Sequence, residues 1–126
     1  MSHFKGVNVV SIYVKDWEAS KKFYRDLLGW PIRWQDDKMG WEEYGWEGKA
    51  DVSISRWDES EPIPPNLGRT TLVLTVEDAV KTLAELRARG IRCDDAVTIP
   101  GVVVVAALYD PEGNRIQFVS ENPPPT

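Results

Sequence analysis

The sequence has one cysteine and one histidine among its 126 residues. Because Cys93 is alone, no disulfide can form within the chain, and nothing indicates an oxidising compartment. We expect an inert, at least half-buried thiol there. His3 lies close to the N-terminus, so we expect neither a Ser-His-Asp triad nor a Cys-His pair inside the fold. These two shortages disfavour nucleophilic catalysis.

Long apolar runs are also missing. No hydrophobic segment approaches the roughly 20 residues that a membrane-spanning helix requires. The opening residues, MSHFKGVNVVSIYV, lack a basic stretch followed by an apolar segment and a small-residue cleavage site, so we expect a mature, cytoplasmic, soluble protein. The net charge is −5 and the basic residues are scattered, which disfavours nucleic acid as a partner.

Tryptophan, by contrast, is abundant. The chain has six, and five of them lie between residues 30 and 57. The hydrophobic fraction of 42 % is sufficient for the core of one compact domain. The chain as a whole therefore has an ordinary hydrophobic fraction, and its tryptophans are concentrated in the segment from 30 to 57.

The first half of the chain begins with a predicted strand and helix. The strand covers residues 9 to 16, where β-branched and aromatic residues favour extended structure. Asp16 is predicted to cap the helix that follows, and Gly29 to end it in a left-handed conformation. The expected apolar stripe of this helix comprises Ala19, Phe23, Tyr24, Leu27 and Leu28.

The second half repeats this pattern. Residues 70 to 78 are a predicted strand, Asp78 is the expected cap, and Gly90 is the expected helix end. The spacing from cap to glycine is 13 residues in the first half and 12 in the second. The expected stripe comprises Val80, Leu83, Ala84 and Leu86. The match indicates an internal duplication.

Three further strands are predicted after each helix. They cover about residues 31–36, 40–47 and 50–57 in the first half, and 92–98, 102–109 and 114–120 in the second. Each half is therefore a βαβββ module. One module alone would leave a sheet edge and an apolar face uncovered, so we expect the two to form a single domain. We place module one at about 7–57, a linker at 58–68, module two at about 69–120 and a tail at 121–126.

Paired βαβββ modules of this length resemble the vicinal-oxygen-chelate superfamily, the group of glyoxalase I, extradiol dioxygenases and bleomycin resistance proteins. The most specific segments are VSIYVKDWEASKKFYRDLLGW near the start and LYDPEGNRIQFV near the end. The resemblance implies an α+β fold in which both modules form a curved, mixed eight-stranded sheet around a cleft, with the helices outside. It also implies a homodimer.

Metal-dependent members of that superfamily place four ligands at positions that correspond here to Val9, Ser53 (or Val52), Thr71 and Gln117. Valine has no donor atom, and neutral hydroxyl and amide groups are weak ligands for zinc, nickel or iron. We therefore expect no metal and no other cofactor, and we disfavour metal-dependent glyoxalase I or extradiol dioxygenase activity. A relocated site would draw on Asp36, Asp37, Glu42 and Glu43, but a solvated charged turn explains these residues more simply.

Alternation along the strands assigns one set of side chains to the cleft. The set comprises Val9, Ser11, Tyr13, Ser53, Ser55, Thr71, Val73, Thr75, Arg115 and Gln117. It contains no carboxylate and no histidine, so no acid–base pair is expected, and Tyr13 or Tyr109 alone is weak evidence for catalysis. On the strand at 40–47, Trp41 and Glu43 share one side with Gly45; Glu42, Tyr44 and Trp46 share the other.

These patterns favour a binding protein over an enzyme. Indole rings offer stacking and cation–π contacts, and nearby carboxylates favour a positive charge. The predicted ligand-binding residues are Ser11, Tyr13, Trp34, Trp41, Trp46, Ser53, Thr71, Val73, Tyr109, Arg115 and Gln117, and no catalytic residue is assigned. In a metal-free cleft, the amide of Gln117 can donate and accept hydrogen bonds to a ligand; the alternative is that it bonds only to its neighbours.

We expect a partly aromatic ligand such as an antibiotic, for which a positive charge is one option. Two alternatives stay open. One is a glyoxalase-like lyase, isomerase or dioxygenase with a relocated metal or acid–base site. The other is an interaction module whose cleft is filled by side chains.

Overall fold

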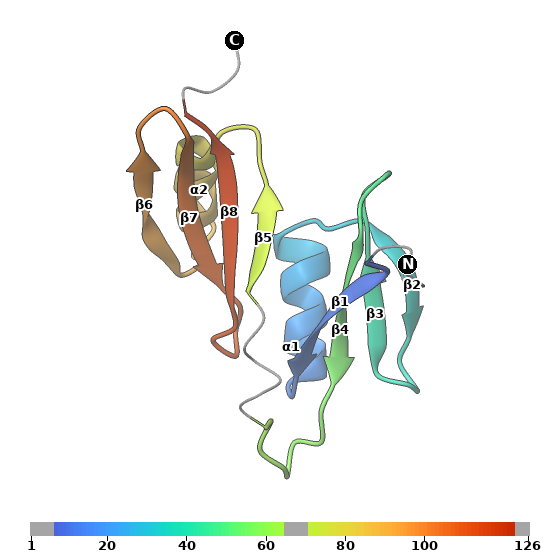
Figure 1. The fold of residues 1–126 in the computed structure, drawn as a ribbon. Coiled ribbons are helices and arrows are strands. Elements are labelled where there is room, and N and C mark those ends of the chain that lie inside the picture. The colour runs from blue at the N-terminus through green and yellow to red at the C-terminus, as the bar shows by residue number, and fades with distance from the viewer. Residues whose placement is uncertain (1–6, 65–70, 123–126) are drawn as a thin grey trace. The chain divides into compact units, whose positions relative to one another are not determined.

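The computed structural model describes residues 7–64 and 71–122. The chain divides into two compact units, residues 1–68 and 69–126, and the described strands and helices of each follow the order βαβββ (Figure 1). The predicted α+β class with two βαβββ modules is confirmed, and the described residues form two mixed sheets of four strands. His3, linker residues 65–68 and tail residues 123–126 lie outside the described part of the chain.

The first unit forms its sheet in the order β1-β4-β3-β2 (Figure 1). Its elements are β1 (Val9–Val14), α1 (Trp17–Lys21), η1 (Lys22–Leu27), β2 (Ile32–Asp36), β3 (Trp41–Tyr44) and β4 (Asp51–Arg56). Strands β1 and β4 are parallel, and the other neighbours are antiparallel. The helix packs on one face of the sheet, which leaves a helix-free face on the other side.

The second unit has the same arrangement, in the order β5-β8-β7-β6. Its elements are β5 (Leu72–Thr75), α2 (Ala79–Ala88), β6 (Cys93–Ile99), β7 (Val103–Tyr109) and β8 (Arg115–Glu121). Strands β5 and β8 are parallel, like β1 and β4. No helix within the described stretches has the length and apolar character needed to cross a bilayer.

The predicted helix caps and stops are confirmed. The carboxylate of Asp16 accepts a hydrogen bond from the Ala19 amide at 3.1 Å, and Asp78 accepts one from Lys81 at 3.1 Å. Each satisfies an amide that has no partner within its helix. The stop glycines have positive φ angles, 69° at Gly29 and 79° at Gly90, as a left-handed helix end requires.

The two helices differ in their winding. After Lys21 the first helix continues as the π-helix η1, in which the Leu28 amide donates to the Phe23 carbonyl, five residues earlier, at 2.9 Å. This wider turn accounts for the extra residue between cap and glycine in the first module. It also changes the buried face, because Phe23 is buried but Leu27 is 41 % exposed. The prediction that Leu27 belongs to the buried stripe was therefore wrong.

The buried stripe of α2 starts one residue earlier than predicted. Its buried residues are Ala79, Leu83 and Leu86. Val80, which was expected in the stripe, is 58 % exposed, and Ala84 is exposed. The cause lies at the start of the helix, where the Ala79 amide donates to the Ser120 hydroxyl of β8 at 2.8 Å. This bond turns Ala79, rather than Val80, toward the sheet.

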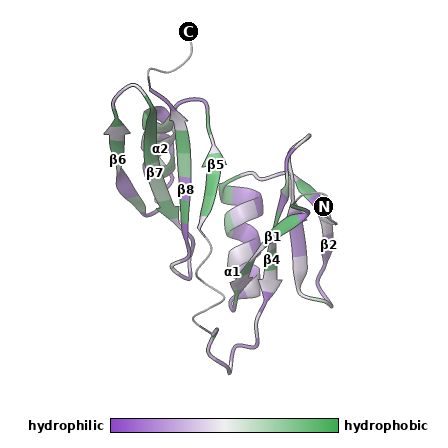
Figure 2. Ribbon diagram, in the orientation of Figure 1, coloured by the Kyte–Doolittle hydropathy of each residue, from purple (hydrophilic) through white to green (hydrophobic). Residues whose placement is uncertain are grey.

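The cores lie between each helix and its sheet. In the first unit Val14, Tyr24, Tyr44 and Ile54 have no exposed surface, and in the second Ile116 and Phe118 are 1 % exposed. Figure 2 shows β5 and β7 as mostly hydrophobic and β2 as mostly hydrophilic. The burial of Val14, Ile116 and Phe118 on the helix side confirms the predicted sidedness of β1 and β8.

Candidate functional site

Four residues, one from each strand, lie in a row across the helix-free face of the first sheet. Trp34 of β2 pairs with Glu43 of β3, Glu43 pairs with Ser53 of β4, and Ser53 pairs with Ser11 of β1. We call these four residues the Glu43 row. Trp34 is 49 % exposed, so its indole ring is available for stacking.

A second row lies beside the first and contributes two more aromatic residues. Trp41 and Tyr13 both pair with Ser55, from either side of β4. The Trp41 indole N–H donates to Oε1 of Glu43 at 3.1 Å, and the Tyr13 ring meets the Trp57 ring edge to face at 5.2 Å. The structure thus brings five predicted ligand-binding residues onto one face: Ser11, Tyr13, Trp34, Trp41 and Ser53.

Two carboxyl groups on this face were missed by the sequence analysis. The neighbouring Asp51 carboxyl, together with burial, raises the pKa of the Glu43 carboxyl above its usual range. Asp51 also forms an ion pair with Arg33, with 3.4 Å between Nε and Oδ1. The expectation of a face without carboxylates was wrong. Alternation separates the two sides of β3, but only the pairing of Glu43 with Ser53 shows which side meets β4.

Gly45 makes room for this carboxyl cluster. A β-carbon placed at Gly45 would overlap the Asp51 carboxylate and the Arg33 guanidinium. Glycine at this position therefore lets both charged groups lie against the backbone at the end of β3.

Two hydroxyl groups of the Glu43 row have no hydrogen-bond partner within residues 7–64 and 71–122. Ser53 has no exposed surface, and within the described part of the chain neither its Oγ nor the buried Oγ of Ser11 makes a hydrogen bond. An unsatisfied buried hydroxyl costs about 1–3 kcal/mol. A molecule that bonds to these groups would recover part of that free energy.

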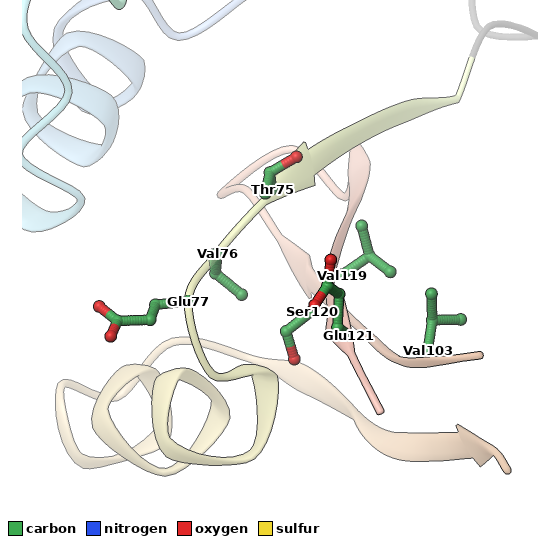
Figure 3. Close-up of a pocket in the computed structure, with 7 residues that line it drawn as sticks. All are labelled: Thr75, Val76, Glu77, Val103, Val119, Ser120 and Glu121. Atoms are coloured by element: carbon green, nitrogen blue, oxygen red, sulfur yellow. The ribbon is translucent and has the colours of Figure 1, made fainter. Parts of the chain in front are cut away.

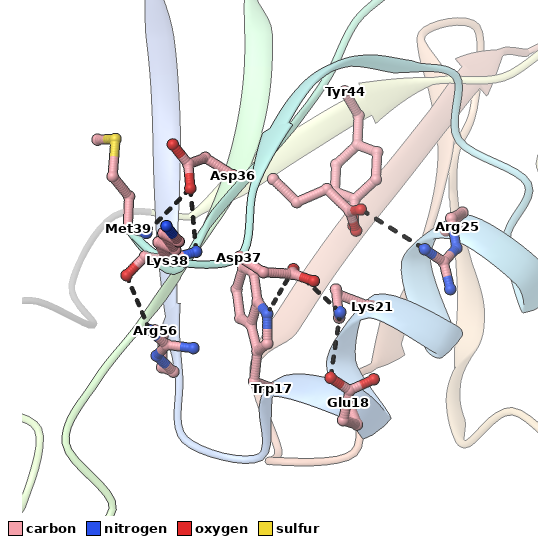
Figure 4. A network of polar contacts seen from close by, with 11 residues as sticks. Trp17, Glu18, Lys21, Arg25, Asp36, Asp37, Lys38, Met39, Tyr44 and Arg56 are labelled. Carbon is pink, nitrogen blue, oxygen red and sulfur yellow. Dashed lines mark hydrogen bonds and ion pairs between the residues drawn. The ribbon is translucent and has the colours of Figure 1, made fainter.

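The acidic residues considered for a relocated metal site do not point toward a common position. Asp36 caps the β2–β3 turn by accepting from the amides of Lys38 and Met39 at 3.0 and 3.2 Å. Asp37 accepts from the Trp17 indole at 3.0 Å and from Lys21 at 3.1 Å (Figure 4). These bonds lower the pKa of the Asp37 carboxyl. The carboxylates of Asp36 and Asp37 are therefore both engaged in hydrogen bonds within the fold.

Glu42 lies on the helix side of the sheet and is fully buried, so the prediction of a solvated charged turn was wrong for this residue. Its Oε2 accepts from the Tyr44 hydroxyl at 2.5 Å, and its Oε1 lies 3.8 Å from a guanidinium nitrogen of Arg25 (Figure 4). Burial and this hydrogen bond raise the pKa of the Tyr44 phenol. Glu43 points to the opposite face, so the four acids do not converge.

The helix-free face of the second sheet carries the other predicted residues. Asp94 accepts from Nε of Arg115 at 3.0 Å and from the Tyr109 hydroxyl at 2.9 Å. The Arg92 guanidinium lies 4.1 Å from the Tyr109 ring centroid. The bonds from Arg115 and Tyr109 lower the pKa of the Asp94 carboxyl. Tyr109 and Arg115 are therefore joined through one carboxylate that the sequence analysis did not select.

Gln117 lies beside this cluster and pairs with Val73, which is 52 % exposed. Thr71 is exposed just before β5. These two and Val73 are the remaining predicted residues of the second unit.

Trp46 lies apart from the Glu43 row. Its ring meets the Trp30 ring at 5.4 Å, and Trp30 in turn contacts Tyr24 and Tyr44 at 4.9 and 5.8 Å. Tyr24 and Tyr44 belong to the core under the helix. The structure thus places Trp46 in an aromatic cluster on the helix side, away from the other predicted residues of this unit.

The residues at the family's metal positions do not fit a metal ion. Val9, Ser53, Thr71 and Gln117 offer two hydroxyls, one amide and no charged donor. Within residues 7–64 and 71–122, no three His, Cys, Asp or Glu side chains come together as a metal site. Cys93 is half-buried, and burial raises the pKa of its thiol, as expected for an inert group.

The second unit also contains an open hollow of about 560 Å³ (Figure 3). Its lining comprises Thr75, Val76, Glu77, Val103, Val119, Ser120 and Glu121. Alternation had placed Thr75 on the cleft side, but none of the seven was selected as a ligand-binding residue. Glu77 and Glu121 lie in or next to the loops that end β5 and β8, where strand patterns carry no signal.

The fold and these two faces define a small α+β protein built from duplicated βαβββ modules. The family model described as the Glyoxalase/Bleomycin resistance protein/Dioxygenase superfamily matches residues 6–118. The chain belongs to this family, as the sequence resemblance implied.

Individual relatives agree with this assignment. The chain is 26 % identical over 120 residues to the uncharacterized protein YraH of Bacillus subtilis (strain 168), covering 86 % of this chain and 93 % of that protein. It resembles the crystal structure of TnmS3, an antibiotic binding protein from Streptomyces sp. CB03234, with a TM-score of 0.74 and 27 % identity over 96 % of this chain and 99 % of that one. A glyoxalase/bleomycin resistance protein from the same Streptomyces has a TM-score of 0.68 and 28 % identity, covering 90 % and 98 % of the two chains.

Proposed function

We propose that this protein binds and sequesters a small, partly aromatic molecule, of the kind represented by planar antibiotics, without the help of a metal ion. The observation that carries this proposal is the Glu43 row with its neighbour Trp41. It combines an indole ring that is 49 % exposed with two buried hydroxyls that have no partner among the described residues. Stacking surface and unsatisfied polar groups on one sheet face are what a planar polar ligand requires.

Two further points support the proposal. TnmS3, whose structure is described as that of an antibiotic binding protein, shares the fold and 27 % of its residues with this chain. The residues at the family's metal positions are poor ligands, which favours binding over metal-dependent chemistry. We further propose a cytoplasmic homodimer that binds neither nucleic acid nor membranes.

Tryptophan fluorescence tests the proposal. We would titrate the protein with a panel of planar aromatic antibiotics, comparing the wild type with Trp41→Phe, Trp34→Phe and the matched control Trp46→Phe. At least one compound should quench the wild type, and the smaller phenyl ring of Trp41→Phe or Trp34→Phe should weaken binding by less than the roughly 1–1.5 kcal/mol of a whole aromatic contact. Trp46→Phe should bind like the wild type, because Trp46 contacts Trp30 on the other side of the sheet.

Metal content is the second measurement. Untagged protein would be incubated with zinc, nickel, iron and manganese, and then desalted. We expect less than about a tenth of an equivalent of each metal, since tight sites need several charged or imidazole ligands. Near-stoichiometric retention of one metal together with no quenching by any compound would overturn the proposal.

A second candidate is metal-free acid–base catalysis. The Glu43 carboxyl favours it, because the neighbouring Asp51 and burial raise its pKa, and a carboxyl group with a raised pKa can act as a general acid. Turnover of a bound compound by the wild type that is lost in both Glu43→Gln and Asp51→Asn would establish this alternative.

A further inference from the structure

The helix-free face of the second sheet changes from charged to apolar along its strands. At one end the Tyr109 amide donates to the Arg92 carbonyl at 2.9 Å, and Tyr109 also pairs with Arg115. We call these three residues the Arg92 row. Farther along the same face lies a second row, the Val105 row, whose members in pairing order are Val97, Val105, Val119 and Thr75. Helix α2 packs on the opposite face of this sheet.

The Arg92 row carries one positive charge in excess. Nε of Arg115 lies 3.0 Å from Oδ2 of Asp94, so these two charges balance each other. The Arg92 guanidinium lies 4.1 Å from the Tyr109 ring centroid, and no carboxylate of the described residues forms an ion pair with it. Stacking occupies the flat face of a guanidinium and leaves the N–H groups at its edge available to an acceptor. A group with a single negative charge would balance this excess.

The Val105 row offers apolar surface that a ligand can reach. Val97 is 58 % exposed, and Val105 and Val119 are half-buried. Val119 also lines the open hollow of about 560 Å³, which continues this surface toward the ends of β5 and β8 (Figure 3). That volume lies within the range of roughly 300–1,000 Å³ that is usual for small-molecule sites.

The distance and the charges between the two rows define the direction of a ligand. Arg115 and Val119 are four residues apart on β8, so the rows lie about 13 Å apart. An extended chain of about eight to ten carbon atoms spans that distance. Glu77 and Glu121 line the hollow, and their carboxylates would repel an anionic group there. A negative head group is therefore favoured at the Arg92 row only.

We propose that this face binds an amphiphilic carboxylate, which is a monoanionic head group joined to an unbranched apolar chain. The carboxylate accepts two hydrogen bonds from the edge of the Arg92 guanidinium, and the chain lies over Ala107 and the Val105 row toward the hollow. The inference concerns the second unit alone and goes beyond the proposed function, whose ligand binds through the Glu43 row.

The test compares octanoate, octanol and octylammonium, which have the same chain length and differ in charge. Amide shifts of ¹⁵N-labelled protein, followed by titration at neutral pH, would measure both the affinity and the place of binding. We expect octanoate to bind about tenfold tighter than octanol, because a charge-assisted pair of hydrogen bonds is added. Octylammonium should bind no tighter than octanol, and the largest shifts should lie in β7 and β8.

A series of chain lengths tests the apolar part of the site. Full burial of one methylene group strengthens binding about fourfold, so on an open face we expect roughly a twofold gain per methylene from hexanoate to octanoate to decanoate. Equal affinities across the series would show that only the head group is bound, and would overturn the inference.

Three variants separate the head group from the chain. Arg92→Gln should weaken octanoate about tenfold and leave octanol unchanged. Val97→Gln should weaken both compounds by a similar factor, because it removes apolar surface and no charge. The control Lys81→Gln removes one positive charge from an exposed residue of α2, on the other side of the sheet, and should behave like the wild type. Circular dichroism would verify that each variant is folded.

The remaining outcomes distinguish this inference from the proposed function. Equal binding of octanoate and octanol, or octanoate binding that is unchanged in Arg92→Gln, would overturn the inference. Shifts confined to the first unit, or binding of none of the probes, would also overturn it, while quenching of tryptophan by a planar compound would still support the proposed function. Octanoate binding that is unchanged in Trp34→Phe and Trp41→Phe would support the inference even if no planar compound quenched the protein.

Discussion

The two modules place different chemistry at equivalent positions of the same fold. The helix-capping residues Asp16 and Asp78 align β1 with β5, and the strand pairings then align the remaining strands. The row Trp34, Glu43, Ser53 and Ser11 of the first module corresponds to Asp94, Ala107, Gln117 and Val73 of the second. At the centre of the row, the first module thus has Glu43 and Ser53 where the second has Ala107 and Gln117.

The ion pairs of the two faces are reversed. In the first module Asp51 of β4 pairs with Arg33 of β2, and in the second Arg115 of β8 pairs with Asp94 of β6. Positions 51 and 115 are equivalent, so acid and base have exchanged strands. Either polarity supplies an attraction between these strands.

On the helix side, Glu42 of the first module corresponds to Ala106 of the second, since both are paired with the equivalent core residues Ile54 and Phe118. Glu42 is fully buried and Ala106 is 4 % exposed. The first module therefore contains a buried carboxylate where the second has a methyl group.

Placing a buried carboxylate in the second module should have the largest effect on stability. Ala106→Glu would place a carboxylate among Phe118 and its apolar neighbours without counterparts of Tyr44 and Arg25, at a cost of at least about 3 kcal/mol. Urea denaturation followed by circular dichroism should show a partly or fully unfolded protein. Val97→Glu on β6, at a residue that is 58 % exposed, is the control and should be close to wild type. Wild-type stability of Ala106→Glu would contradict the assignment of this face to the core.

The reverse change should have a smaller effect. Glu42→Ala would leave a cavity and remove the acceptor of the Tyr44 hydroxyl, with an expected loss of about 2–4 kcal/mol in the free energy of unfolding. Glu42→Gln keeps the size and one acceptor, so it should lose less. If Glu42→Ala proved as stable as the wild type in urea, the buried carboxylate would have no structural role.

The smallest effects should appear in the pH dependence and should have opposite signs in the two modules. Because the pKa of Asp94 is lowered, its ionised form contributes stability at neutral pH that is lost as pH falls. Asp94→Asn should therefore be destabilised near neutrality and match the wild type in strong acid. Because the pKa of Glu43 is raised, Glu43→Gln should instead gain stability over the wild type as pH rises.

Thermal denaturation across pH would measure both differences. Parallel curves for the two variants would show that the carboxyl groups do not titrate as their surroundings indicate. Glu47→Gln serves as the charge control, because Glu47 is exposed in the turn after β3.

Much of this fold could be predicted because its signals are local. An aspartate before each helix, a glycine after it and alternation along each strand depend only on neighbouring residues. The two sides of β3 were also predictable, with Trp41 and Glu43 on one and Glu42 and Tyr44 on the other.

The carboxyl pair could not be predicted, because it depends on cross-strand register. Whether Glu43 meets Ser53 is fixed by the β3–β4 pairing, and the turn between those strands carries only weak signals. The burial of Glu42 was missed for a related reason, since an acid is seldom buried without partners, and Arg25 comes from a different element. The shifted stripe of α2 depends on the bond to Ser120, 41 residues away along the chain.

The π-helix η1 has a consequence for how the two halves can be compared as products of duplication. Its wider turns absorb one additional residue between Asp16 and Gly29 while the strands on either side keep their pairing. An alignment of the two halves therefore needs its gap inside a helix, where gaps are usually penalised, rather than in a loop. In this fold an inserted residue can therefore lie within a helix while the pairing of the strands stays unchanged.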